Sequence, residues 1–343
     1  MNYRILVTGA SGFIGSFIVE RGLQEGYEVW AGMRGTSSRK YLQDERIRFA
    51  ELDLQNPEKL RSQLLLYKEA MGGRGWDYVV HAAGATKCLH ADDFYKVNTQ
   101  GTKNLVEALL ATHQPLRRFV YLSSLSIYGP VRDQQLHEEI RDTDTPQPNT
   151  AYGRSKLAAE QYLDQLSTQG KDLPFVVLRP TGVYGPRERD YYMMAKSIKQ
   201  HVDFAVGYQR QDLTFVYVSD VVQAVFLALD HGVTGAKYFL SDGEVYLSRT
   251  FSDYLRREMG NPWWVRVKAP LFVLRAITFL GEYWGRLTGK VTALNNDKYH
   301  IMRQRNWRCD IQPAITQLGY HPQVKLEEGV RRTVSWYKEN GWL

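Results

Sequence analysis

Residues 4–16 constrain the fold of this chain more than any other stretch. An apolar run, Ile5-Leu6-Val7, is followed by three glycines, Gly9, Gly12 and Gly15, at the head of an amphipathic segment. This order is typical of a buried strand, a tight turn and a helix whose N-terminal end binds a diphosphate. Gly9 permits the turn, Gly12 lets the backbone approach the phosphates, and Gly15 lets the helix lie close to the strand. The run predicts a dinucleotide site lined by Gly9, Ser11, Gly12, Phe13, Ile14 and Gly15.

Apolar segments alternate with helical patterns through residues 1–180. Strands that are separated by helices pair in parallel through right-handed crossovers, which predicts an α/β fold with a doubly wound sheet. Ligands of such a sheet bind beyond the carboxyl ends of its strands. Strands are predicted over residues 4–8, 28–33, 47–52, 77–82, 118–123 and 175–179.

The regular alternation stops near Pro186, which predicts a second, smaller lobe of mixed structure. Residues 214–231 indicate one more strand–helix unit, with Ser219 or Asp220 as the helix cap. The chain closes with an amphipathic helix over 326–337. The expected boundaries are 1–182 and 212–235 for the dinucleotide-binding (Rossmann) domain, and 183–211 and 236–343 for the substrate-binding lobe.

The net charge of +7 is concentrated near the C-terminal end. Residues 249–343 contain 16 Lys and Arg against 8 Asp and Glu, whereas the preceding residues contain 28 against 29. This asymmetry is typical of a solvated basic surface, and the alternative is contact with an anionic membrane or an acyl carrier. We expect no nucleic-acid partner.

Cysteine content and hydropathy indicate the compartment. Cys88 and Cys309 are the only cysteines, and they show neither a disulfide framework nor metal-ligand spacing, so we expect a reducing environment and no metal. A strand that begins at residue 4 leaves no room for a signal peptide. The apolar window 270–284 is interrupted by Arg275 and Glu282 and is too short to span a bilayer. The expected location is the cytoplasm.

The ends of the second and third strands carry side chains suited to the adenosine half of a dinucleotide. Arg34 lies 19 residues beyond Gly15, where an acid binds a free ribose 2′-hydroxyl and an arginine suits a 2′-phosphate. NADP(H) is therefore favoured as the cofactor, with NAD(H) as the alternative. Asp53 and the adjoining Leu54 are expected beside the adenine, unless Asp53 instead caps the helix after Asn56.

Later strand ends add small and hydroxyl side chains at the same edge. Ala82, Ala83 and Gly84 leave room for a flat ligand, and Ser124 follows the fifth strand. His81 is expected to be packed or next to the cofactor, since no second metal ligand stands near it.

Tyr152 and Lys156 are the most informative pair. Four residues apart on a predicted helix, they share one face, although such a pair by itself is usually a solvated surface. A phenol is a poor acid or base at neutral pH, and a neighbouring cation favours its ionised form. We expect Tyr152 to move a proton and Ser124 to hydrogen-bond the same substrate oxygen.

In combination these motifs resemble the extended short-chain dehydrogenase/reductase family, also called the NAD-dependent epimerase/dehydratase superfamily. The similarity includes TGASGFIG, HAAG, Tyr-x-x-x-Lys, the run 178–186 and the closing LGYHP at 318–322. The resemblance implies that Ser124, Tyr152 and Lys156 are the catalytic residues and that Lys156 also holds the nicotinamide ribose. A homodimer is expected. The resemblance implies further cofactor contacts at Asn98, Pro180, Gly182 and Val183.

Departures from the family pattern bear on the substrate. Members that act on sugar nucleotides usually carry Asn in place of Gly182 and Arg in place of Leu213, and these groups hold the sugar-nucleotide diphosphate. Their loss weakens that recognition by several kcal/mol, because hydrogen bonds to charged groups contribute about 1.5–3 kcal/mol each. Arg210 would compensate in part. Leu125 does not supply the acid that dehydratases place beside the catalytic hydroxyl.

Arg34 and the run 178–186 are similar to the 3β-hydroxysteroid dehydrogenase and dihydroflavonol reductase branch. The apolar stretch 271–280 is interpreted first as core, second as a substrate lid and third as a membrane-contacting helix. The predicted function is an NADP(H)-dependent oxidoreductase that transfers a hydride between nicotinamide and a secondary alcohol or ketone of a mid-sized apolar substrate, such as a steroid, a flavonoid or a β-keto acyl compound. The alternatives are an NAD-dependent nucleotide-sugar epimerase and a non-catalytic dinucleotide-binding regulator.

Overall fold

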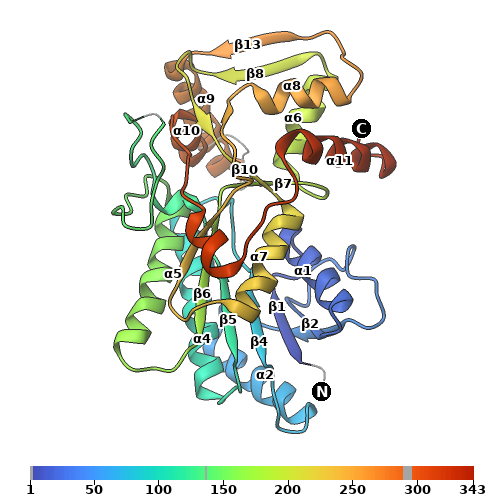
Figure 1. Ribbon diagram of the computed structural model, residues 1–343, viewed down its shortest axis with the longest axis vertical. Helices are drawn as coiled ribbons and strands as arrows, with labels where there is room; N and C mark the ends of the chain where they lie inside the picture. Colours follow the sequence, from blue (N-terminus) through green and yellow to red (C-terminus); the bar gives the residue numbers. More distant parts are fainter. Residues whose placement is uncertain (1–2, 136, 289–295) are drawn as a thin grey trace.

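A computed structural model describes residues 3–135, 137–288 and 296–343. At its centre is a seven-stranded sheet in the order β3-β2-β1-β4-β5-β6-β11, and every neighbouring pair is parallel. Helices cover both faces of this sheet (Figure 1). The predicted doubly wound fold is confirmed. The strands are β1 (Arg4–Thr8), β2 (Glu28–Met33), β3 (Arg48–Glu51), β4 (Tyr78–His81), β5 (Arg118–Leu122), β6 (Phe175–Pro180) and β11 (Lys237–Leu240).

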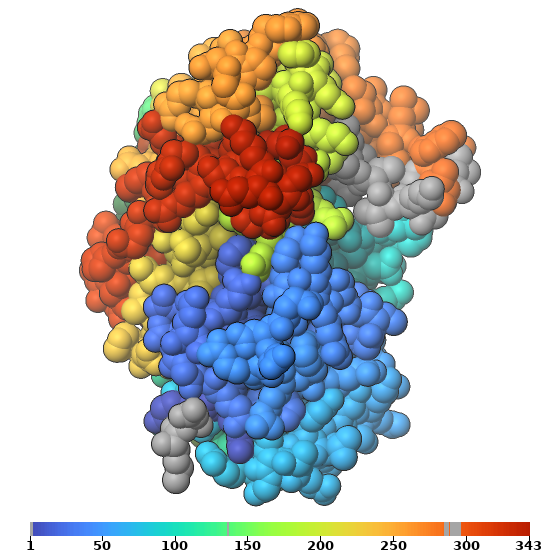
Figure 2. Space-filling model, turned by 90° about the vertical axis from the view of Figure 1, so that its right-hand side faces the viewer, coloured from blue at the N-terminus to red at the C-terminus, as the bar shows by residue number. Residues whose placement is uncertain are grey.

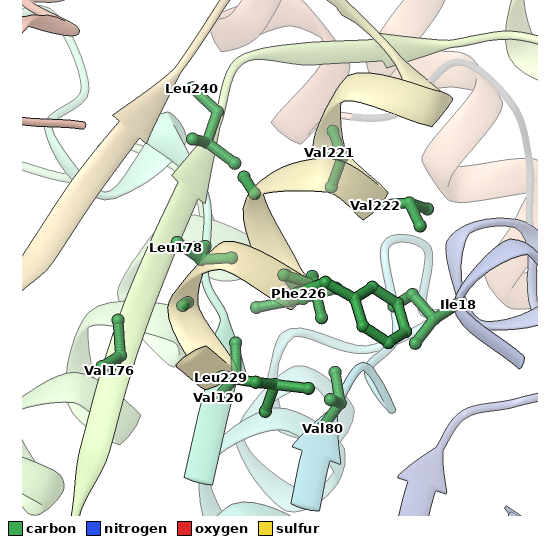
Figure 3. Close-up of a cluster of buried hydrophobic side chains, with 14 of the residues drawn as sticks. Ile18, Val80, Val120, Val176, Leu178, Val221, Val222, Phe226, Leu229 and Leu240 are labelled. Atoms are coloured by element: carbon green, nitrogen blue, oxygen red, sulfur yellow. The ribbon is translucent and has the colours of Figure 1, made fainter. Parts of the chain in front are cut away.

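Alternating strand residues feed two separate cores, because successive side chains point to opposite faces of the sheet. Ile5 and Val7 pack into one core, whereas Leu6 packs into the other. Phe226 and its neighbours on α7 cover the centre of the first core, against strands β4, β5 and β6 (Figure 3). The first core is covered by α1 (Phe13–Gln24) and α7 (Val218–His231), and the second by α2 (Pro57–Ala70), α4 (Gly101–Ala111) and α5 (Ala151–Thr168).

The smaller lobe lies beyond the carboxyl ends of the strands (Figure 1). Its own core is rich in aromatic side chains, among them Tyr184, Phe215 and Tyr337. Three two-stranded sheets belong to this region, β7–β10, β9–β12 and β8–β13. The elements are β7 (Gly182–Tyr184), α6 (Asp190–Lys199), β8 (Val202–Val206), β9 (Asp212–Leu213), β10 (Phe215–Tyr217), β12 (Tyr246–Leu247), α8 (Thr250–Glu258), β13 (Val265–Ala269), α9 (Leu271–Thr288), α10 (Asn296–Arg303) and α11 (Leu326–Glu339).

The chain returns to the sheet more often than predicted. Residues 236–343 were assigned to the substrate lobe, but β11 forms the edge strand beside β6, and the turn η3 (Ala314–Leu318) packs on α7 and β11. This strand follows the point where the regular alternation of strands and helices ends, so its place in the sheet depends on pairing with β6 and not on the local pattern. The predicted caps of α7 are also wrong, because the helix begins at Val218 and the Asp220 carboxylate instead accepts from the backbone of Gln323 and Val324.

The apolar stretch 271–280 lies in α9, and only one narrow side of this helix is buried. Leu274 is buried, but Phe272 and Phe279 are exposed. Core was the first interpretation, and it does not hold for this exposed face. Among the described residues, no helix combines the length and apolar character needed to cross a bilayer.

Candidate active site

The glycine loop has the geometry that its sequence predicts. Gly9 adopts φ +69°, and a Cβ there would lie 2.6 Å from the backbone nitrogen of Ala83. A Cβ on Gly15 would lie 2.1 Å from the carbonyl oxygen of Gly9, so only glycine lets α1 start this close to β1. Gly12 is the N-cap of α1 and has no side-chain cap, which leaves backbone N–H groups of the first turn for an anion. Ser11, Gly12 and Phe13 border a hollow beside this helix end.

The residues predicted to contact the adenosine half of the cofactor are partly or fully exposed to solvent. Arg34 follows β2, is exposed, and forms no ion pair or side-chain hydrogen bond with the residues that the structure describes. Asp53 pairs with Lys59 at 3.6 Å and does not cap α2, because Asn56 Oδ1 accepts from the Lys59 backbone at 3.0 Å. Leu54 is half-buried, and its carbonyl accepts from Asn104.

The end of β4 connects the glycine loop to the predicted catalytic helix. The backbone of Ala82 donates to the carbonyl of Thr8, and Ala83 lies against Gly9. A Cβ on Gly84 would lie 3.1 Å from both Asn98 Oδ1 and Lys156 Nζ. The absence of a side chain at Gly84 therefore lets the backbone after β4 lie close to the Asn98 amide and the Lys156 ammonium.

Asn98 is held by a local departure from α-helical geometry. It lies in a π-helical turn, η1 (Tyr95–Gln100), between α3 (Ala91–Phe94) and α4. Its amide bonds both the N–H and the carbonyl of Ala85 and donates to Ser155 Oγ. Such turns are frequent at functional sites, and their position is not readable from sequence periodicity.

His81 is fully buried and has two side-chain partners. Its Nδ1 lies 2.7 Å from Thr8 Oγ1, and its Nε2 lies 2.9 Å from Thr102 Oγ1. Burial, with a smaller contribution from the charge of Lys156, lowers its pKa to about 3. The imidazole is therefore neutral and packed, one of the two roles expected for it. Within the described ranges no cluster of His, Cys, Asp or Glu is arranged to hold a metal ion.

Ser124 and Tyr152 meet, although 28 residues of chain separate them. Ser124 caps a short turn after β5, while Tyr152 lies in the first turn of α5. The Ser124 hydroxyl donates to Ser126 Oγ at 3.2 Å and is also close enough to Tyr152 to influence the pKa of its phenol. Burial raises the pKa of Tyr152, and the neighbouring Ser124 hydroxyl opposes that rise. Lys156 is not a cause of the shift, so the expected lowering by the neighbouring ammonium is not found.

Lys156 is buried one turn further along α5. Its Nζ donates to the carbonyl of Leu122 at 2.8 Å and lies 4.8 Å from the ring centre of Tyr121. Burial lowers the pKa of Lys156 to about 8, and the carboxylate of Glu160 opposes this shift. The ammonium is thus fixed between the end of β5 and Gly84.

A buried network behind Lys156 was missed in the sequence. Glu160 accepts from Ser123 Oγ at 2.5 Å and from the guanidinium of Arg179, which also donates to Tyr128. Ser123 precedes Ser124, so this network fixes the backbone next to the hydroxyl. The available signals were the i,i+4 spacing of Glu160 from Lys156 and an arginine within an apolar strand.

A second missed residue is Asp297 of α10. Its carboxylate accepts from the backbone N–H groups of Ala151 and Tyr152, at 3.0 and 3.1 Å. It supports the N-terminal end of α5 together with Thr150, whose hydroxyl accepts from Gly153. Nothing in the sequence connects two segments this far apart.

A cavity of about 310 Å³ opens beside Ser124, between the sheet and the smaller lobe. Pro180 and Gly182 line it, whereas Val183 packs between the cores. None of residues 271–280 is among the described residues that line this cavity, so their predicted role as a substrate lid has no support in the geometry. Other lining residues include Phe204, Leu213, Phe215, Arg249, Met302 and Trp307.

Relatives of known activity cover nearly the whole chain. It is 27% identical to dTDP-D-glucose 4,6-dehydratase of Mus musculus over 98% of its length and 89% of the relative. It is 25% identical to the decarboxylating sterol-4-alpha-carboxylate 3-dehydrogenase of Schizosaccharomyces pombe, covering 97% of this chain and 96% of the relative.

A solved structure shares the fold. The UDP-glucose 4-epimerase of Thermus thermophilus in complex with NAD has a TM-score of 0.76 at 24% identity, over 98% of this chain and 99% of the other. The model of the NAD dependent epimerase/dehydratase family matches residues 5–241. Because this match covers more than half of the chain and includes the glycine loop, Ser124, Tyr152 and Lys156, the chain belongs to the NAD dependent epimerase/dehydratase family.

Proposed function

We propose that this protein is an NADP(H)-dependent oxidoreductase acting on a secondary alcohol or ketone of a mid-sized, largely apolar molecule. Use of a nicotinamide dinucleotide agrees with the family, and the glycine loop with the hollow beside Ser11, Gly12 and Phe13 fits that group. The observation that carries the proposal is the place of Ser124 in the wall of the 310 Å³ cavity, with Tyr152 close enough for the Ser124 hydroxyl to influence the pKa of its phenol.

The side chains divide the work between the substrate oxygen and the cofactor. Ser124 donates a hydrogen bond to the carbonyl oxygen of a ketone, where negative charge develops. Burial keeps Tyr152 protonated at neutral pH, so its hydroxyl is a proton donor to the same oxygen. Lys156 presents its ammonium to the ribose. The nicotinamide, when bound, supplies or accepts the hydride.

The cavity wall supports an apolar substrate. Where sugar-nucleotide enzymes of the family usually carry Asn, a Cβ on Gly182 would lie only 2.7 Å from the hydroxyl of Tyr191. Leu213 lines the cavity where those enzymes usually carry Arg. Arg266, also in the wall, is neutralised by Asp203 and by Asp253 at 2.8 Å.

One observation favours the sugar-nucleotide alternative. Arg249 lines the cavity and has no ion-pair partner among the described residues, so it is available to a diphosphate. The dehydratase and epimerase relatives act on such substrates. Purified protein that retains stoichiometric NAD and shows no net oxidation of added NADPH would identify an epimerase and contradict the reductase.

The preference for NADP(H) rests on Arg34. Its guanidinium is unpaired and exposed at the end of β2, and Ser38 and Lys40 lie near Ser11 in the adjoining hollow. The T. thermophilus neighbour binds NAD instead. Affinities for NADPH and NADH, measured by fluorescence titration of the wild type and Arg34→Ala, test the preference. We expect Arg34→Ala to weaken the binding of NADPH and to leave the binding of NADH unchanged. Equal affinities of the wild type for NADPH and NADH would contradict the proposed preference.

Catalysis is tested with Tyr152→Phe. Reduction of steroid, dihydroflavonol and β-keto acyl ketones is followed through NADPH absorbance, and we expect kcat to fall by about 10²–10⁴-fold because the proton donor is lost. NADPH affinity is the control and should change little. A variant as active as the wild type on the accepted ketone would contradict the assignment and favour a non-catalytic regulator.

A further inference from the structure

Helix α9 exposes its apolar side. Leu274 and Thr278, four residues apart, form its buried stripe at 4% and 1% exposure, whereas Phe272 and Phe279 are 75% and 70% exposed. A threonine is thus buried while phenylalanines face solvent, the reverse of an ordinary surface helix. In Figure 2, α9 lies at the upper right margin of the molecule. The exposed large apolar residues of α9 are Phe272, Ile277, Phe279, Leu280, Tyr283 and Trp284.

The ribbon formed by β8 and β13 continues this apolar surface. Phe204 pairs with Val267 across the ribbon, and the two are 65% and 42% exposed. The alternate residues, Asp203 and Arg266, form an ion pair on the inner face of the ribbon. The ribbon leads directly into α9, and Leu271 lies within 4 Å of a Cβ built on Gly207, at the end of β8. We call these exposed faces of α9 and of the ribbon the α9–ribbon surface.

Charge on the α9–ribbon surface has one sign. The exposed charges on the described residues of β8, β13 and α9 are Lys268 and Arg275, both basic. The acidic side chains of the same elements are less exposed, since Asp203 is buried and paired and Glu282 is half-buried. The β13 and α9 parts of this surface lie in the segment 249–343, whose net charge is +8.

We propose that the α9–ribbon surface docks on an anionic lipid bilayer. Exposed phenylalanines enter the interface between headgroups and acyl chains, while Tyr283 and Trp284 combine an apolar ring with a polar tip that suits the same depth. The basic side chains add attraction to anionic headgroups. A second copy of this chain is disfavoured as the occupant, because it would bring Lys268 and Arg275 against like charges.

The experiment is flotation of the full chain with vesicles of phosphatidylcholine, with and without phosphatidylglycerol. We expect binding to the anionic vesicles that weakens as salt rises. Phe279→Glu should reduce the partition coefficient by about tenfold or more, since a phenylalanine contributes about 1.5–3 kcal/mol when buried. Leu66→Glu is the matched control, because Leu66 is 63% exposed on α2 at the opposite end of the fold, and it should bind as the wild type does.

Each outcome of the flotation experiment either supports or contradicts docking on a bilayer. Because residue 279 is exposed, Phe279→Glu should keep the circular dichroism spectrum and the NADPH affinity of the wild type. A loss of vesicle binding in this variant is then caused neither by misfolding nor by failure of the proposed function. Wild-type protein that does not float with anionic vesicles would overturn the proposal, as would Phe279→Glu floating equally well. A wild-type dimer that Phe279→Glu converts to a monomer, with no vesicle binding, would identify a second copy as the occupant instead.

Discussion

Lys156 combines deep burial with a positive charge at neutral pH. Its pKa is lowered to about 8 by burial, so the ammonium predominates below that pH and is lost as pH rises through it. We expect kcat/KM to fall above about pH 8 in the wild type, because in the proposed reaction the charged form of Lys156 holds the ribose. A pH–rate profile checks this. Lys156→Arg keeps its charge at high pH and should not show that decline, and a wild-type profile that stays flat to pH 10 would contradict the prediction.

His81 makes stability depend on acidity. Its pKa is about 3 in the folded protein and about 6.5 when unfolded, so the unfolded chain binds the extra proton first. The free energy of unfolding should therefore fall as pH drops from 6.5 toward 3, by about 1.4 kcal/mol per unit from this group. Urea unfolding of the wild type and His81→Asn at several pH values measures it. The variant should show a shallower slope, and equal slopes would mean that other groups cause the loss.

The sequence indicates the residues whose neighbours are local or whose place in the sheet is regular. Tyr152 and Lys156 follow from helical spacing, and Ser124 from its place after a strand. The lowered pKa of Lys156 and the raised pKa of Tyr152 could not be predicted, because both depend on burial by distant segments. The same holds for Asp297, which reaches α5 from α10.

At the scale of elements, α5 depends on the second lobe for its start. The Asp297 carboxylate accepts from two backbone N–H groups at the positive end of this helix. Asp297→Ala should lower the free energy of unfolding by about 1–2 kcal/mol, as loss of a helix cap does. It should also lower kcat with little change in NADPH affinity, because Tyr152 lies in the freed turn. Asp297→Asn keeps one acceptor and should lose less, and an Asp297→Ala variant with wild-type stability and kcat would contradict this role.

Six strands of the central sheet were predictable to within one or two residues, because their short β-compatible runs are bounded by turns and separated by helical patterns. The seventh strand, β11, and the π-helical turn η1 were not. Both are defined by packing partners that the local pattern does not contain, namely β6 for β11 and Ser155 for Asn98. The interpretation of 271–280 as core fails on the exposed face of α9 for a related reason. Periodicity shows that one face of a helix is apolar, but it does not show what covers that face.

At the scale of the whole molecule, the two lobes share packing and do not form separate folding units. Ile14, Phe17 and Val183 contact both the sheet core and the core of the smaller lobe. The chain also crosses the boundary between the two lobes where β11 and η3 return to the central sheet. The boundary between the lobes is therefore crossed by packed side chains and is not a linker with few contacts.

We therefore expect a single cooperative unfolding transition. Hydrogen exchange followed by mass spectrometry in increasing urea should give the same midpoint for peptides from β5 and from α11, which belong to different cores. Phe17→Ala should lower both midpoints equally, because the ring bridges the cores. Leu64→Ala, within the second core, serves as the control for simple loss of apolar burial. Separate midpoints in the wild type would show that the lobes unfold independently despite the shared packing.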